Sequence, residues 1–388
     1  MRSMAGSRRD FWLASALLAA TAAGALALPS ALWACGLAAL LGLAGVVLLR
    51  GNRWRTGALV ATALAVSVGL LDAAAGLLSP APMGRGLVQT TDPRPWPPPD
   101  PVLGFRPRPN TEIVATATFG PQTIYRRTYH FDGDAARVTP AAPAGADTYL
   151  FLGDSFVFGQ GLADDQSVAA QFAKANDYKV RTVNLGVPGY GPNHLVRAFE
   201  AGLLDRYVDK SVKAVVSWII PAHLARVTGD GAWLGSSPRY VLDNGVPRYT
   251  GSFAEYRWTH PLAGLKHLLG EHFQFVDAIG MRQRQEQQAD LFVALMVRLK
   301  QLAREKFGAP LIVVYSWPDE VHSKGYGEAA FLITVLDRLR RAGIELLSVD
   351  NLTNRIDISL LLIPHDGHPT AYTYELIAGE LKRRLAER

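Results

Sequence analysis

Three long apolar runs near the start of the chain constrain its fold more than any other feature. They cover residues 11–28, 31–49 and 57–78, and Asp72 in the third run is the only charged side chain among them. Each run is close to the roughly 20 residues that an α-helix needs to cross the hydrocarbon core of a bilayer. The sequence therefore predicts a membrane anchor of three transmembrane helices.

The arginines around these runs predict the orientation of the anchor. One cluster precedes the first run and another lies between the second and third: Arg2, Arg8, Arg9, Arg50, Arg53 and Arg55. Because positively charged loops stay on the cytoplasmic side, everything after residue 78 is expected outside the cytoplasm, on the periplasmic side of the inner membrane. A cleaved signal peptide and a two-span anchor are the alternatives.

Composition excludes several classes of function. The formal net charge is +6 over 388 residues. The basic residues do not form a stripe interleaved with aromatic residues, so the sequence gives little support for nucleic-acid binding. The single cysteine, Cys35, lies in an apolar run, so an intrachain disulfide and a cysteine-based zinc site are excluded. No cofactor or metal is expected, and the oligomeric state cannot be inferred from the sequence.

Beyond the anchor, three segments differ from the main pattern. Residues 79–101 contain DPRPWPPPDP, which is typical of an extended Pro-rich linker. Residues 102–147 alternate β-forming and polar side chains, which predicts an N-terminal β extension. Residues 229–260 contain RYVLDNGVPRYTG, a β-hairpin pattern that we interpret as an insertion near the substrate.

The rest of the chain alternates strands and helices. Strands are predicted at 149–153, 180–184, 214–220, 310–316 and 345–349, and helices at 165–176, 193–207, 281–307, 328–342 and 371–386. Five short buried strands separated by helices are typical of an α/β fold with a parallel sheet between two helical layers.

The segment TYLFLGDSFVFGQG at residues 148–161 carries the first candidate site residue. Its β-forming run stops at Gly153, and a helical pattern resumes at Asp164, so Ser155 follows the carboxyl end of a strand. A serine at such a turn is either a reactive nucleophile or a cap of the following helix.

A possible general base lies near the end of the chain. His368 in HDGHPTAYTYEL precedes the last predicted helix, with Asp366 two residues earlier. The order serine, aspartate, histidine occurs in several α/β hydrolases. The alternative is a turn residue beside a surface histidine.

Three blocks together resemble the GDSL/SGNH hydrolase superfamily of serine esterases, lipases and carbohydrate deacetylases. GDSF at 153–156, with Gly159-x-Gly161 after it, is similar to the first block, NLGVPG at 184–189 to the second, and Asp366 with His368 to the last. The resemblance covers about residues 148–387 and implies a flavodoxin-like three-layer fold. It also implies Ser155 as nucleophile, His368 as base, Asp366 as its orienting partner, and the N–H groups of Ser155 and Gly189 as oxyanion donors.

Two features depart from the family pattern. The third block of the family supplies an asparagine as a further oxyanion donor, but here the strand VVSWII continues into PAHLAR at 221–226. His223 is the nearest substitute, unless it only satisfies loop carbonyls; Asn193 and His194 are further candidates, Asn193 also as a helix cap. The aspartate-to-histidine spacing is one residue shorter than usual, which makes His365 an alternative base.

Aromatic residues are candidates to line a sugar or acyl site, since aromatic faces suit both: Tyr190, Trp218, Trp233, Tyr240 and Trp317. Trp218 lies in a predicted strand, where core packing is the alternative.

The sequence thus predicts a membrane-anchored serine esterase that removes O-acyl groups, such as acetyl, from an envelope or exported glycan or a small ester. Alternatives are an O-acyltransferase using the same acyl-enzyme and a catalytically degenerate glycan-binding or assembly subunit.

Overall fold

The computed structural model describes residues 2–27, 31–78, 86–208, 210–273, 281–316 and 329–387. The chain divides into two compact units. The anchor unit comprises Met1–Ala81 and His260–Gln283, and the sheet unit comprises Pro82–Thr259 and Arg284–Arg388. All candidate catalytic residues belong to the sheet unit.

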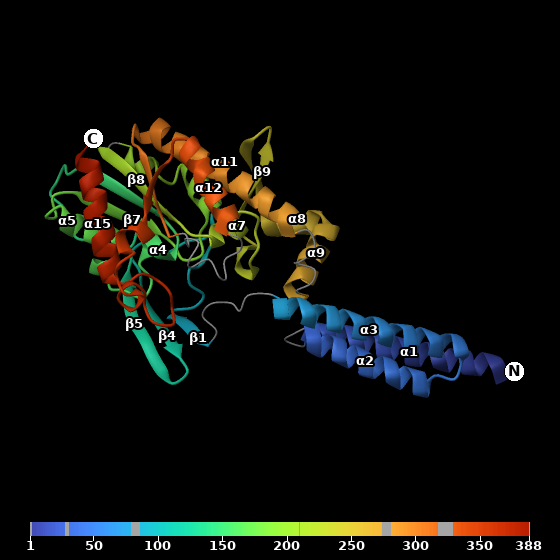
Figure 1. Cartoon of the computed structure of the whole chain (residues 1–388). Helices are drawn as coiled ribbons and strands as arrows, with labels where there is room; N and C mark the ends of the chain where they lie inside the picture. Colours follow the sequence, from blue (N-terminus) through green and yellow to red (C-terminus); the bar gives the residue numbers. More distant parts are fainter. Residues whose placement is uncertain are drawn as a thin grey trace. The chain divides into compact units, whose positions relative to one another are not determined.

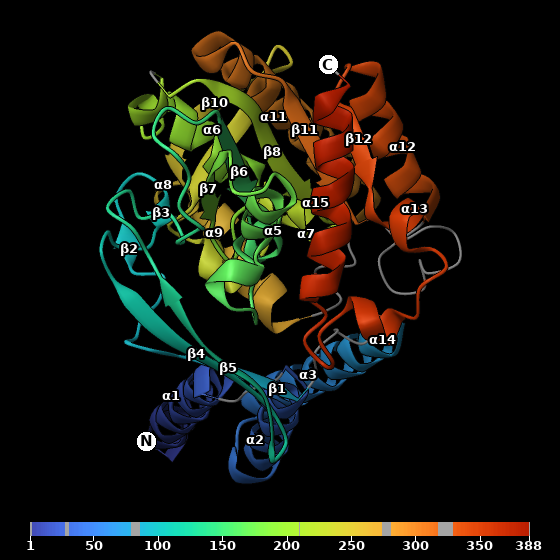
Figure 2. The same cartoon turned by 90° about the vertical axis from the view of Figure 1, so that its left-hand side faces the viewer.

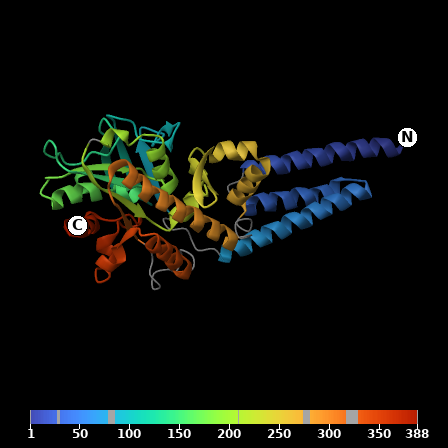
Figure 3. The same cartoon turned by 90° about the horizontal axis from the view of Figure 1, so that it is seen from above.

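Three long helices form most of the anchor unit: α1 (Arg2–Ala27), α2 (Ala31–Leu48) and α3 (Asn52–Leu78). They lie alongside one another (Figures 1 and 3). Small residues let α2 and α3 approach closely, because a Cβ atom added at Gly45 would lie 3.1 Å from Ala58 Cβ. Such packing of small residues is typical of helix pairs in membranes.

Arg8 and Arg9 of the first arginine cluster lie beside the second cluster at the α2–α3 connection. Asp10, at the start of the first apolar run, accepts hydrogen bonds from the backbone N–H groups of Arg50 (3.2 Å) and Gly51 (2.7 Å). Arg9 Nη2 donates to the carbonyl oxygen of Leu48 at 2.8 Å. The segment of α1 around Arg9 and Asp10 therefore meets the α2–α3 connection, which brings the arginines of both segments together.

Among the described residues, one helix is long and apolar enough to cross a membrane, namely Asn52–Ala75. Trp33–Leu48 is also apolar but shorter. The prediction of three spans therefore stays a prediction. Large apolar side chains such as Leu18, Leu40 and Leu64 are exposed on the three helices.

A helix absent from our sequence predictions completes the anchor unit. It is α9 (Pro261–His272), and Leu262, Leu265, Leu268 and Leu269 are exposed along it. Its sequence, PLAGLKHLLGEH, is short and contains two glycines, which weakens the helical pattern.

A five-stranded parallel sheet forms the centre of the sheet unit. Its strands are β6 (Thr148–Gly153), β7 (Arg181–Gly186), β8 (Val212–Ile219), β11 (Leu311–Tyr315) and β12 (Glu345–Ser348). The order across the sheet is β12-β11-β8-β6-β7. Counted along the chain this is the flavodoxin-like order 2-1-3-4-5, so the predicted α/β fold is confirmed.

Helices cover both faces of this sheet (Figure 2). Alternate residues of β6 point to opposite faces, so Leu150 and Leu152 pack with one set of helices and Phe151 with the other. The first set is α6 (Pro192–Glu200), α11 (Met281–Phe307) and α12 (Ala329–Arg341); the second is α5 (Val168–Ala175) and α15 (Ala371–Ala386). The predicted helix at 193–207 ends early, and a 3₁₀ turn at Asp205–Tyr207 follows.

The predicted linker requires a correction. Within residues 79–101, the described part begins at Gly86, and Leu87–Asp92 forms strand β1, antiparallel to β4 (Glu112–Phe119). The alternating β-formers of LVQTTD satisfy their backbone hydrogen bonds on the edge of β4. Trp96, in the Pro-rich stretch, then packs on Phe131 and Phe158, with ring centroids 5.9 and 5.6 Å apart. This stretch is therefore folded onto the sheet unit.

The two predicted β regions are present. In the N-terminal extension, β4 pairs with β5 (Gln122–His130), and β3 (Gly104–Phe105) pairs with β2 (Pro99–Asp100) of the preceding segment. In the insertion, β9 (Pro238–Asp243) and β10 (Val246–Ser252) form a hairpin around Asn244 and Gly245. Both turn residues have positive φ, as a two-residue hairpin turn of this type requires. The other α-helices of the described residues are α4 (Ser155–Phe158), α7 (Ala222–Arg226), α8 (Phe253–Thr259), α13 (Val349–Thr353) and α14 (Ile358–Leu361).

Candidate active site

Ser155 lies where strand β6 turns into α4. Asp154, not Ser155, caps this helix, because its Oδ1 accepts a hydrogen bond of 3.0 Å from the backbone N–H of Phe156. Ser155 is the first helical residue and is only 6% exposed. Its hydroxyl is therefore free of the capping role that was the alternative to a catalytic one.

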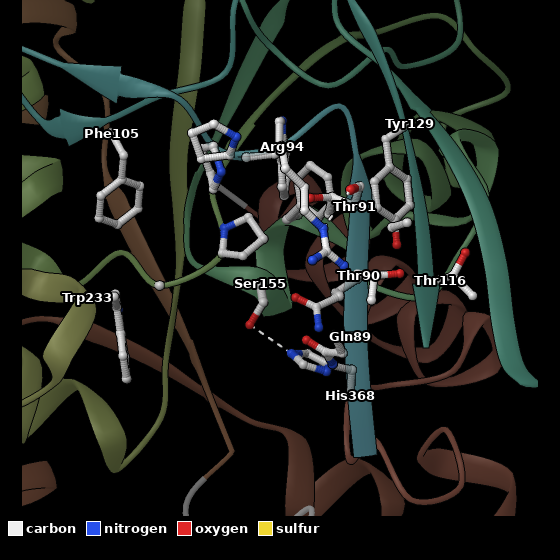
Figure 4. A pocket seen from close by; sticks show the side chains of 18 of the residues that line it. Gln89, Thr90, Thr91, Arg94, Phe105, Thr116, Tyr129, Ser155, Trp233 and His368 are labelled. Carbon is white, nitrogen blue, oxygen red and sulfur yellow. Dashed lines mark hydrogen bonds between the residues drawn. The ribbon is translucent and has the colours of Figure 1, made fainter. Parts of the chain in front are cut away.

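The structure brings Ser155, His368 and Asp366 together in that order. His368 Nε2 lies 2.7 Å from Ser155 Oγ, as the dashed line in Figure 4 marks. The other ring nitrogen, Nδ1, is hydrogen-bonded to Asp366 Oδ1. The geometry is that of a serine, histidine and carboxylate triad.

Asp366 is held on several sides. Besides His368, it accepts hydrogen bonds from Gln89 Nε2 (2.9 Å) and from the hydroxyl of Tyr125 (3.2 Å). The backbone N–H of His368 donates a further bond of 3.2 Å. Gln89 lies on β1, inside the segment that we predicted to be a linker, so sequence reasoning missed this contact.

These contacts keep Asp366 ionised. Burial acts to raise the pKa of Asp366, but hydrogen bonds and the charge interaction with His368 outweigh it and leave the pKa below its usual value. A carboxylate can only accept hydrogen bonds, so Nδ1 of His368 donates to it. Nε2 of a neutral His368 is then left to accept the proton of the Ser155 hydroxyl.

The block NLGVPG fixes the position of α4. Asn184 on β7 donates hydrogen bonds to the carbonyl oxygens of Val157 (3.1 Å) and Phe158 (3.3 Å), and its Oδ1 accepts one from the Gly186 N–H. At Gly186 a Cβ atom would lie 2.3 Å from the backbone nitrogen of Phe158. Only glycine therefore allows β7 to pack this closely against the helix that carries Ser155.

Gly189 and Ser155 line the same pocket and are the candidate oxyanion donors. Gly189 has φ of +91°, a backbone conformation that glycine adopts without strain. The N–H of Ser155 belongs to the first turn of α4, where helical N–H groups have no partner within the helix. Both backbone N–H groups therefore stay candidate oxyanion donors.

His223 does not take the role that its position in the sequence suggested. Its Nε2 is bonded to Asp154 Oδ2 at 3.0 Å, and its Nδ1 accepts from the backbone N–H of Ile220 at 3.5 Å. Burial lowers the pKa of His223, so its ring is neutral and Nε2 carries the hydrogen that bonds to Asp154. Because both ring nitrogens are occupied away from the pocket, the prediction of His223 as an oxyanion donor is wrong.

Arg226 is the charged residue that sequence reasoning missed. One of its nitrogens, Nη1, donates both to Asp154 Oδ2 and to the carbonyl oxygen of Tyr190, each at 2.8 Å. Arg226 also lines the pocket beside Ser155 and Gly189. Its spacing of three residues from His223 on α7 puts both side chains on one helical face, which was the available sequence signal.

Asp154 is the buried centre of this group, with no exposed surface. Burial acts to raise the pKa of Asp154, but His223, Arg226 and the Phe156 N–H together hold it well below its usual value. The charged Asp154, which directly precedes Ser155 in the chain, thus holds the side chain of Arg226 in place.

The remaining candidate polar residues lie outside the pocket. Asn193 does not cap α6 but donates to the carbonyl oxygen of Pro238 at 2.7 Å. His194 accepts a bond of 3.1 Å from the Gly191 N–H, and burial together with Arg226 lowers its pKa to about 3. His365 stacks on Phe119 with ring centroids 3.9 Å apart. Of the two candidate bases, His368 is the one beside Ser155.

The pocket beside Ser155 has a volume of about 780 Å³. In Figure 4, Phe105 and Trp233 lie on one side of Ser155, while Gln89 and Thr90 from β1 lie on the other. A Cβ atom at Gly189 would lie 3.1 Å from Trp233 Nε1 and 3.5 Å from Phe105 Cζ, so both rings lie directly beside this glycine. The cavity is within the size range of small-molecule sites.

The other described aromatic candidates do not line the pocket. Trp218 is buried in the core and donates to Ser316 Oγ at 3.2 Å. Tyr240 is buried and bonded to Glu200 at 2.6 Å, and the buried Tyr190 donates to the carbonyl oxygen of Phe105. Trp317 lies outside the described residues. Only Trp233 of the five therefore lines the pocket within the described part of the chain.

Comparison with known proteins gives structural matches only. No family model and no curated protein matches the chain. Similar solved structures include a member of the lipolytic protein G-D-S-L family from Veillonella parvula, with 12% identity over 63% of this chain and 100% of that one, TM-score 0.35. A psychrotrophic esterase from Pseudoalteromonas sp. matches with 11% identity over 62% and 97%, TM-score 0.35.

A third similar structure is an alpha/beta hydrolase enzyme from the metagenome of Lake Arreo in Spain, with 13% identity over 64% and 97%, TM-score 0.36. All three similarities are remote. The function is therefore argued from the geometry of the site itself.

Proposed function

We propose that the protein is a serine esterase, with Ser155 as nucleophile, His368 as general base and Asp366 as the residue that orients His368. One observation carries the proposal: Ser155 Oγ, His368 and Asp366 form a continuous hydrogen-bonded chain at the edge of a pocket. A serine hydroxyl becomes an effective nucleophile when a neighbouring base removes its proton.

In this mechanism Ser155 Oγ attacks the ester carbonyl carbon while its proton passes to His368 Nε2. The tetrahedral intermediate collapses, the bond to the leaving alcohol breaks, and His368 returns the proton to the alcohol oxygen. Water then attacks the acyl-enzyme as His368 takes its proton. The bond between the acyl carbon and Ser155 Oγ breaks, His368 returns the proton to Oγ, and the acid leaves. Asp366 holds the His368 ring and stabilises its charged form.

The backbone N–H groups of Ser155 and Gly189 stabilise the oxyanion in this proposal. Arg226 positions both of them. It binds Asp154, the residue before Ser155, and the carbonyl oxygen of Tyr190, the residue after Gly189. A single guanidinium thus ties together the two backbone segments that carry the donors, in a protein that lacks the family asparagine.

The substrate class we infer is an O-acylated glycan. Trp233 is 57% exposed although it lies against Gly189, and Phe105 lies on the same side of Ser155. An exposed aromatic ring at a reacting centre offers a flat surface for a sugar, whose C–H groups pack on aromatic faces. The acyl group would enter beside Ser155 while the sugar packs on Trp233.

We also propose that three membrane spans hold this unit outside the cytoplasm. The support is that Arg8 and Arg9 of the first arginine cluster lie beside the second cluster, where the Asp10 contacts join α1 to the α2–α3 connection. With that connection in the cytoplasm, α3 ends on the opposite side of the membrane.

The test is hydrolysis of p-nitrophenyl acetate and release of acetate from an acetylated oligosaccharide by the full chain in detergent. Wild type should hydrolyse both, and Ser155→Ala should be inactive, whereas Ser211→Ala, at an exposed site, should match wild type. Unchanged activity in Ser155→Ala would remove the mechanism. Acetate transferred to an added sugar instead of water would identify an acyltransferase, which forms the same acyl-enzyme.

A further inference from the structure

Two arginines and a histidine, Arg94, Arg226 and His368, line the pocket, and no acidic side chain of the described residues does. The nearby carboxylates, Asp154 and Asp366, are both bonded to partners named above: Asp154 to His223 and Arg226, and Asp366 to His368. The pocket therefore presents positive charge to whatever enters it.

The charge of Arg226 is already compensated, whereas that of Arg94 is not. Arg226 forms an ion pair of 2.8 Å with Asp154. Arg94 donates through Nε to the carbonyl oxygen of Thr91 at 3.1 Å, and no carboxylate of the described residues pairs with it. Among the described residues no hydrogen bond is formed by the two terminal nitrogens of Arg94, which leaves them to bind a ligand.

The position of Arg94 is set by its neighbours. It lies between Pro93 and Pro95, which restrict the backbone, and Trp96 packs on Phe131 and Phe158. Figure 4 shows the Arg94 side chain reaching into the pocket toward Gln89 and Thr90. Gln89 is itself bonded to Asp366, so the guanidinium lies on the side of the site that carries the triad.

We propose that Arg94 binds the anionic group of an acidic glycan, a sugar carboxylate or a sugar phosphate, while an O-acyl group of the same glycan reaches Ser155. The inference rests on the proposed esterase function and adds the charge of its substrate. A guanidinium offers two parallel N–H donors that match the oxygens of a carboxylate or phosphate. Trp233 and Phe105, on the other side of Ser155, hold the sugar ring.

Binding measurements separate this inference from catalysis. The full chain carrying Ser155→Ala, in detergent, is titrated with hexagalacturonate, with neutral maltohexaose and with glucose 6-phosphate, using calorimetry. We expect hexagalacturonate or the sugar phosphate to bind at least about tenfold more tightly than maltohexaose, and the difference to shrink with added salt. Whichever anion binds identifies the carboxylate or the phosphate as the recognised group.

The matched variants are Arg94→Gln and Arg108→Gln in the Ser155→Ala background, Arg108 being exposed and outside the pocket. Arg94→Gln should weaken anion binding about tenfold, Arg94→Lys should restore part of it, and Arg108→Gln should leave it unchanged. Equal affinity for the neutral and anionic sugars, or unchanged anion binding in a folded Arg94→Gln protein, would overturn the inference.

Loss of esterase activity alone does not decide whether Arg94 binds an anion. A wild-type protein that binds the anionic sugar through Arg94 but hydrolyses no ester would contradict the proposed function and leave the anion site standing. A protein that hydrolyses acetate esters but binds acidic and neutral sugars alike would contradict only the anion site.

Discussion

Gln89 Nε2 donates a hydrogen bond of 2.9 Å to Asp366 Oδ2, across 277 positions of the chain. The bond joins β1, the strand that pairs with β4, to the loop that carries His368. Part of the segment predicted to be a linker thereby belongs to the candidate active site.

Gln89→Ala should lower kcat/KM on p-nitrophenyl acetate about threefold to tenfold. The loss is moderate because Tyr125 and the backbone N–H of His368 still hold Asp366. Steady-state kinetics measure it, with Gln122→Ala as the control because Gln122 is exposed at the start of β5. An unchanged kcat/KM would show that β1 does not support the triad.

Asp366→Asn should lower kcat by roughly a thousandfold or more, because an amide stabilises neither the required tautomer of His368 nor its charged form. Wild-type Asp366 has a pKa below its usual value, so its carboxylate stays ionised at every pH above about 4. Kinetics from pH 5 to 9 should therefore show a deficit in the variant across the whole range. A variant that recovers wild-type kcat at high pH would contradict this role.

Asp154→Asn should destabilise the sheet unit by about 3 kcal/mol, because it removes the charge that pairs with Arg226 inside the protein. The folded pKa of Asp154 is depressed, so its stabilisation is complete above the unfolded value of about 4 and is lost as pH falls toward the folded value. Denaturant unfolding in detergent at pH 7 and pH 3 checks this. The difference in the free energy of unfolding between wild type and Asp154→Asn should be smaller at pH 3 than at pH 7. An equal difference at both pH values would contradict the charge pairing.

Gly189→Ala should reduce kcat about a hundredfold with a smaller change in KM, since one oxyanion donor is displaced. Two features of position 189 would displace the backbone of the variant. The φ of +91° is strained for alanine, and the new Cβ would lie 3.1 Å from Trp233 Nε1. Adding Trp233→Ala removes the contact but not the backbone strain, so the double variant should stay impaired. Full recovery in the double variant would show that contact alone was responsible.

Local patterns were enough to predict the turn that carries Ser155 and to single out Asp366 and His368 as candidates, whereas the block at 184–189 was recognised by its resemblance to a family motif and its packing role was not predicted. The turn and the Asp366–His368 pair are each encoded within a few residues, by a strand that ends at glycine or by a loop before a helix. The parallel sheet also followed from alternating strands and helices.

Long-range contacts could not be predicted in this way. The Pro-rich composition of residues 79–101 indicated a spacer. The residues near Leu87 do not reveal that this segment pairs with the edge of β4, which follows later in the chain. His223 was assigned from its place after β8, whereas its orientation depends on Asp154, 69 positions earlier. Arg226 and Gln89 also act through distant partners, Asp154 at 72 positions and Asp366 at 277 positions along the chain.

Covalent labelling of the serine tests the central claim most directly. The full chain is treated with a fluorophosphonate probe at pH 7 and the modified peptide is identified by mass spectrometry. We predict one adduct, on Ser155, that is absent from Ser155→Ala and much slower to form in His368→Gln. No adduct on Ser155 of the folded wild-type protein, or equal labelling of the His368→Gln variant, would contradict the proposal that His368 activates Ser155.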